Sequence, residues 1–158
     1  MKYLLIVIAF DLLLVGCCYE VDCEQENINF GLVSFTQSEA DTIVFRKYQA
    51  KSNFQILEDT MQIANINVLT PVIRNDTILF WTSNSRTTNI KFQLSAGNDY
   101  EIFIPAANKL ARITDIVEQK TKIKHCDISD GNKICYNPLI SFRVDGQLKT
   151  SEPFYILR

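Results

Sequence analysis

The chain has 158 residues and a net charge of −2, with 47% hydrophobic and 22% charged residues. This composition can build a hydrophobic core, which excludes a wholly disordered or collagen-like chain. The near balance of 16 basic and 18 acidic residues argues against nucleic acid as a partner. With one histidine and five scattered glycines, the sequence predicts no metal, no cofactor and no phosphate-binding loop.

Residues 1–16 are predicted to be a lipoprotein signal peptide. Met1 and Lys2 precede an apolar run, interrupted by Asp11, that is shorter than the roughly 20 residues a membrane-spanning helix needs. The run ends in Leu-Val-Gly before Cys17, which is typical of a bacterial lipobox. We therefore expect Cys17 to carry a lipid whose acyl chains include palmitate. This lipid would anchor the chain to a membrane. A plain signal peptide cut nearby, or a buried N-terminal strand, is the alternative.

Residues 17–29 are predicted to form an acidic tether. This stretch has four acids and no base, which is typical of a solvated linker. The acids are Glu20, Asp22, Glu24 and Glu26. The remainder, residues 30–158, is then expected to be a single domain.

That domain is predicted to be all-β. Residues 42–48 and 77–82 are rich in β-branched and aromatic side chains, and alternation in residues 140–144 places Ile140, Phe142 and Val144 on one inward face. Turn signals occur at residues 75–76 and 145–146. These patterns favour an antiparallel β-sandwich with an immunoglobulin-like layout, and a flattened β-barrel is the alternative.

Three segments, residues 39–48, 99–105 and 135–141, resemble small uncharacterised envelope lipoproteins of Bacteroidetes-type bacteria. The resemblance implies a β-sandwich-like fold and a lipid-anchored location in the cell envelope, with the outer membrane expected. In such bacteria, acidic residues after the lipidated cysteine are associated with export to the cell surface. The sequence leaves open whether the chain faces the periplasm or the outside.

Four cysteines remain once Cys17 is acylated, and they allow three disulfide pairings. Cys126 and Cys135 flank a polar, turn-rich loop, and we predict a bond between them. Cys18 and Cys23 lie on the predicted tether, where they are free to pair with each other or to stay unpaired. A metal site around His125, Cys126 and Cys135 is disfavoured because the spacing matches no zinc motif.

Lys120, Lys122 and Lys124 alternate along a predicted strand and share one face. They are a candidate anion patch. The simpler interpretation is an edge strand whose lysines prevent pairing with other chains.

No nucleophile, acid–base pair or ligand set stands out, so we expect no enzyme. The sequence favours a lipid-anchored binding or accessory module for a glycan or a protein. A structural envelope component that docks on another protein is the second hypothesis. A hydrolase is the third, because the spatial separation of carboxylates that decides glycoside hydrolysis is not given by a sequence.

Overall fold

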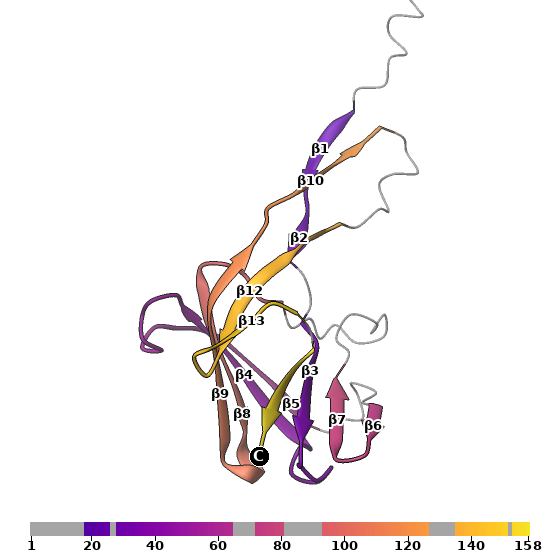
Figure 1. Ribbon diagram of the computed structural model, residues 1–158. Helices are drawn as coiled ribbons and strands as arrows, with labels where there is room; N and C mark the ends of the chain where they lie inside the picture. Colours follow the sequence, from indigo (N-terminus) through magenta and orange to yellow (C-terminus); the bar gives the residue numbers. More distant parts are fainter. Residues whose placement is uncertain (1–17, 26–27, 65–71, 81–92, 127–134, 152) are drawn as a thin grey trace, which may run out of the picture. The chain divides into compact units, whose positions relative to one another are not determined.

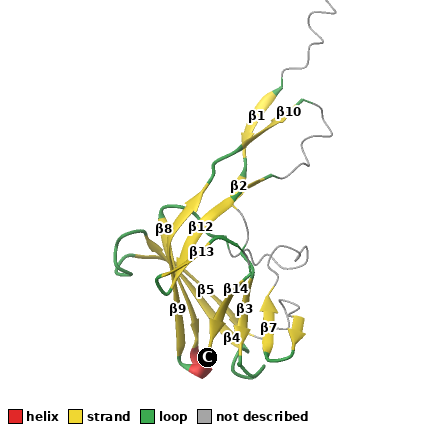
Figure 2. Cartoon of the chain, viewed as in Figure 1, coloured by secondary structure: helices red, strands yellow, loops and turns green. Residues whose placement is uncertain are grey.

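The computed structural model describes residues 18–25, 28–64, 72–80, 93–126, 135–151 and 153–158, almost all of them in strands and loops (Figures 1 and 2). The strands are β1 (Tyr19–Asp22), β2 (Glu24–Gln25), β3 (Phe30–Val33), β4 (Thr42–Gln49), β5 (Leu57–Ala64), β6 (Val72–Arg74), β7 (Thr77–Phe80), β8 (Asn98–Ile104), β9 (Lys109–Glu118), β10 (Lys122–His125), β11 (Tyr136–Asn137), β12 (Leu139–Val144), β13 (Gln147–Lys149) and β14 (Phe154–Leu157). One short 3₁₀ helix, η3 (Pro105–Ala107), connects β8 to β9.

The contacts divide the chain into two compact units. The larger unit comprises residues 25–119 and 138–158, and the smaller comprises residues 1–24 and 120–137. The sequence predicted one domain over residues 30–158, whereas the described residues 120–126 and 135–137 group with residues 18–24. The reason is the long-range pairing of β10 with β1, which joins segments about 100 residues apart.

Two sheets build the larger unit. A six-stranded antiparallel sheet has the order β13-β12-β9-β8-β4-β5 (Figure 1). A four-stranded sheet has the order β14-β3-β7-β6, in which β14 runs parallel to β3. The prediction of a mainly antiparallel all-β fold is confirmed. Among the described strands neither sheet closes on itself, so the flattened barrel is not what forms, and the strand order does not confirm an immunoglobulin-like layout.

Aromatic side chains from both sheets meet in one core. Phe30 of β3 makes an edge contact with Phe45 of β4, and Phe142 of β12 makes one with Phe154 of β14. All four rings are almost fully buried, because period-2 alternation turns every second residue of each strand inward. This core is shared by the two sheets.

The two predicted turns are confirmed. Asn75 connects β6 to β7 with φ 52°, and Asp145 and Gly146 connect β12 to β13 with φ 49° and 80°. Two consecutive positive φ values are the signature of the two-residue hairpin turn that Asp-Gly favours.

The predicted inward position of Ile140 is wrong, although Phe142 and Val144 are buried as expected. Ile140 is 47% exposed. The pairing of β12 with β9 shifts register on both sides of Ser141, and each irregularity changes which side chains face inward. Leu139 packs on the core instead.

Candidate functional site

A polar cavity of about 230 Å³ lies in the larger unit. Its lining residues are Gln25, Phe45, Arg46, Lys47, Asp59, Met61, Gln93 and Tyr100. The strand pairing explains how they meet, because β4 lies between β5 and β8. Residues directly opposite on neighbouring strands share a face of the sheet.

Two rows of side chains line the strand side of this cavity. In one row, Lys47 lies opposite Asp59 of β5 and opposite Tyr100 of β8. In the next, Phe45 lies opposite Met61. Phe45 and Tyr100 belong to the hydrophobic core, so the cavity lies where the core gives way to charged residues.

Carboxamides and charged groups supply the polar lining. The Gln93 side-chain amide donates to the Gln25 carbonyl oxygen at 3.0 Å. The Lys47 ammonium forms an ion pair with Glu58 at 3.5 Å. The cavity therefore offers hydrogen-bond donors, neutral and negatively charged acceptors, and two aromatic rings. Its volume is smaller than the roughly 300–1,000 Å³ of most sites for drug-sized ligands.

A second polar cluster lies on the six-stranded sheet around Glu101 of β8. This side chain is only 5% exposed, yet it is surrounded by donors. The Arg112 Nε donates to one carboxylate oxygen at 3.1 Å. The Tyr48 hydroxyl and Arg46 Nη1 donate to the other at 2.8 and 3.5 Å. Such a buried carboxylate is stable only because charged partners replace its lost hydration.

Two phenylalanines hold the arginines of this cluster. The Arg112 guanidinium lies 4.6 Å from the Phe54 ring centre, and that of Arg46 lies 5.5 Å from Phe103. Phe54 also packs edge-on against Tyr48. Burial, and then the hydrogen bond to Glu101, raise the pKa of the Tyr48 phenol.

The loop that carries Phe54 has a strained backbone. Lys51, Asn53 and Phe54 have φ values of 62°, 53° and 59°. The left-handed region is unfavourable for a bulky side chain such as phenylalanine, and this type of strain is concentrated at functional sites. The Lys51 amide is held by the Asp99 carboxylate at 3.0 Å, which ties the loop to β8.

The predicted Cys126–Cys135 disulfide is wrong. Cys126 is bonded to Cys18, and Cys135 is bonded to Cys23. The pairing of Tyr19 with His125 in the β1–β10 ladder makes Cys18 and Cys126 directly opposite neighbours. Their Cα atoms are 4.2 Å apart, as suits a non-hydrogen-bonded antiparallel pair.

Hydrogen bonds bring the second cysteine pair together. The Cys23 amide donates to the Thr121 carbonyl at 3.1 Å, and the Glu24 amide donates to that of Cys135 at 2.9 Å. The Asn137 side chain joins the same segments, accepting from the Thr121 amide and donating to the Cys23 carbonyl. The residues predicted as an acidic tether thus include paired strands.

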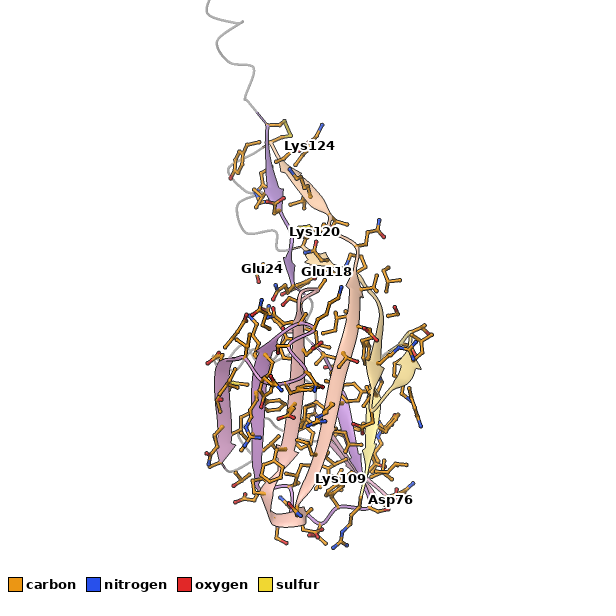
Figure 3. The ribbon with its side chains drawn as sticks, turned by 90° about the vertical axis from the view of Figure 1, so that its left-hand side faces the viewer. Glu24, Asp76, Lys109, Glu118, Lys120 and Lys124 are labelled. Atoms are coloured by element: carbon orange, nitrogen blue, oxygen red, sulfur yellow. A yellow bond between two sulfur atoms is a disulfide. The ribbon has the colours of Figure 1, made fainter. Side chains whose placement is uncertain are left out.

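The candidate anion patch lies in the smaller unit, opposite acidic residues. Lys122 pairs in register with Asp22, and Lys124 with Glu20. The Lys122 ammonium is 3.7 Å from Asp22 and 3.9 Å from Glu20. Lys120 and Lys124 are exposed along this segment (Figure 3). The carboxylates of β1 neutralise most of the lysine charge that would attract an anion.

His125, the last residue of β10, is buried. Its ring centre lies 5.5 Å from that of Tyr19. Within the described residues, neither ring nitrogen has a hydrogen-bond partner. Its neighbour Cys126 and the more distant Cys135 are in disulfides, so neither offers a thiolate to a metal, and the described part of the chain contains no group of three metal-ligating side chains.

Sequence reasoning missed both polar sites of the larger unit. Arg46 and Glu101 are 55 residues apart, and no short motif joins them. The strand pairing of the smaller unit did leave a signal. Acids alternate at residues 20, 22 and 24 and lysines at 120, 122 and 124, which is the pattern of an antiparallel, charge-complementary pair.

In the described ranges, no helix is long and apolar enough to cross a membrane. Comparison with family models, with characterised proteins and with solved structures finds no match. Cys17 lies outside the described residues, so its predicted lipidation stays a prediction.

Proposed function

We propose that the chain is a lipid-anchored binding module of the cell envelope that holds a glycan in the cavity beside Lys47, Asp59 and Tyr100, without catalysis. The observation that carries the proposal is the cavity's lining. A sugar ring presents hydroxyl groups that both donate and accept hydrogen bonds, and an apolar face that packs on aromatic or thioether groups. The carboxylate, ammonium and carboxamides match the hydroxyls, while Phe45 and Met61 match the apolar face.

The disulfides support a location outside the cytoplasm. Such bonds form and persist in oxidising compartments and are rare in reducing ones. The lipobox and the resemblance to envelope lipoproteins add the anchor at Cys17 and the expected outer membrane. The immunoglobulin-like β-sandwich is part of the same proposal, and the core shared by the two sheets supports it.

Binding is tested with purified protein lacking residues 1–16 and a panel of neutral oligosaccharides, followed by calorimetry on the best ligand. The variant Asp59→Asn should weaken binding about tenfold, because it removes a charged acceptor. The matched control is Asp41→Asn, an exposed aspartate at the start of β4, which should bind like wild type. A panel without any ligand, or equal binding by both variants, would contradict the proposal.

Anchoring is tested separately in cells. Cys17→Ser should release the protein from membranes, because the acyl chains would be lost. A variant that still sediments with membranes in high salt and carbonate would show that the lipobox interpretation is wrong.

A second candidate, docking on another envelope protein, is favoured by the outer face of the four-stranded sheet. Tyr155, Gly31, Leu79 and Val72 lie opposite one another in one cross-strand row. Tyr155 is 48% exposed, and contiguous apolar surface of this kind is typical of interaction sites. Tyr155→Arg should abolish recovery of a cross-linked partner from intact cells without affecting glycan binding, and unchanged recovery would rule out this face.

A further inference from the structure

The cluster around Glu101 holds more positive charge than its own carboxylate neutralises. Two guanidinium groups contact one carboxylate, so Glu101 neutralises only one of the two positive charges in this cluster. The protein as a whole carries −2, so this charge is a local feature rather than part of a general basic surface. The Asp145 carboxylate accepts from the Arg112 backbone amide at 2.8 Å and offsets part of this charge, but among the described residues it forms no ion pair with the Arg112 guanidinium.

The arginines also have donors to spare. A guanidinium carries five N–H groups, and Arg46 and Arg112 each give one to Glu101. Arg46 also interacts with the Tyr48 hydroxyl, whereas among the described residues the Arg112 side-chain nitrogens have no hydrogen-bond partner besides Glu101. Arg112 is 50% exposed, so its remaining donors face solvent. Stacking on Phe54 holds the guanidinium plane in one orientation before any ligand arrives.

The strained loop has a purpose in this arrangement. Phe54 adopts a left-handed conformation that glycine or asparagine would adopt at less cost, and its ring touches both Arg112 and Tyr48. The contacts of the ring with Arg112 and Tyr48 offset the cost of this backbone conformation. The half-buried ring combines an apolar surface with an adjacent cation.

We propose that Arg112, Arg46 and Phe54 form a second binding site that takes the carboxylate of an acidic sugar, so that the glycan ligand contains uronic acid residues. A planar carboxylate fits the N–H fork of a guanidinium. Within the same cluster, each arginine already donates one N–H to the Glu101 carboxylate. The Phe54 ring provides a surface for the sugar ring beside it. The choice of a sugar as the carrier of the carboxylate rests on the proposed function, whereas the anion site itself rests on the charge and donors described above.

The test uses a galacturonic acid trimer and, as its neutral match, a galactose trimer, with calorimetry on the protein lacking residues 1–16. Wild type should bind the acidic trimer more tightly, and added salt should weaken that binding. Arg112→Gln should lower its affinity about tenfold, the equivalent of one charge-assisted hydrogen bond. Arg74→Gln, the same change at an exposed arginine on β6, should leave it unchanged.

The Arg112→Gln change removes one of the two positive charges that pair with the buried Glu101 carboxylate, and this loss could destabilise the fold. A second variant therefore tests the site without removing that charge. Phe54→Gly relieves the left-handed strain, should keep the circular dichroism of wild type, and should still weaken binding of the acidic trimer. Equal affinity for both trimers, or full binding by folded Arg112→Gln, would overturn the site. If a glutamate tripeptide, rather than the acidic trimer, bound in an Arg112-dependent way, the proposal that the ligand is a sugar would be wrong.

The two proposals fail in different ways. Asp59→Asn lies in the cavity and should weaken binding of the neutral trimer, whereas Arg112→Gln should not. Loss of the Arg112 effect alone therefore leaves the glycan cavity standing, and loss of the Asp59 effect alone leaves the anion site standing.

Discussion

Removing the two disulfides should destabilise the larger unit in a non-additive way. The residues that each bond joins are 108 and 112 positions apart, so each bond encloses residues 25–119 of the larger unit in one loop. On the chain-entropy model, closing a loop of this length stabilises by about 4.8 kcal/mol. We compare three variants: Cys18→Ala with Cys126→Ala, Cys23→Ala with Cys135→Ala, and all four changes together.

The second bond closes a much smaller loop once the first is present. That loop contains the short stretches from Cys18 to Cys23 and from Cys126 to Cys135, about 15 residues in all, and contributes about 3 kcal/mol. Either pair variant keeps one long loop closed and should lose about 3 kcal/mol. The fourfold variant should lose about 8 kcal/mol, which exceeds the sum of the two by about 2.

Urea denaturation followed by far-ultraviolet circular dichroism measures these losses. Because a domain's stability is about 5–15 kcal/mol, the fourfold variant should be largely unfolded at 37 °C while both pair variants stay folded. Bonds within each local pair, Cys18–Cys23 and Cys126–Cys135, would instead close two independent loops of about 6 and 10 residues. Additive losses that total about 5 kcal/mol would therefore refute the long-range pairing.

Two further predictions concern single positions. A Cβ atom at Gly31 would lie 2.8 Å from the Tyr155 ring, so Gly31→Ala should cost about 1–3 kcal/mol in urea denaturation, and adding Tyr155→Ala should restore most of it. The raised pKa of Tyr48 means that the fold favours the neutral phenol. Its contribution to stability is present below pH 10 and lost as the pH rises above that value, and Tyr48→Phe should remove this loss.

Local chemistry made part of the fold predictable. Alternation and β-branched residues predicted strands in β4, β7 and β12, and Asn75 and Asp145-Gly146 predicted two hairpin turns. These features depend on neighbours within a few residues of one another. Ile140 failed because a register irregularity between β12 and β9 is a property of the pair, which the sequence of one strand does not contain.

The predicted disulfide was wrong for the same reason, over a longer separation in the sequence. The prediction assumed that residues 17–29 are unpaired, which left Cys126 and Cys135 to each other. The complementary charges of β1 and β10 were visible, but their register depends on a contact across about 100 residues. The polar sites are still less predictable, because Arg46, Glu101 and Arg112 come from three strands and meet only once the six-stranded sheet has formed.

The observed pairing changes what the predicted lipid would be attached to. Cys18, the residue after the predicted anchor, is covalently bonded to Cys126, and Cys23 is bonded to Cys135. Two cross-linked cysteines therefore lie between Cys17 and β3 in the sequence. A flexible linker lets its domain diffuse away from the membrane, whereas these bonds tie residues 18–23 to the chain on either side of residues 127–134. If Cys17 is acylated, the lipid is attached next to a disulfide-linked pair of strands rather than to an unpaired linker.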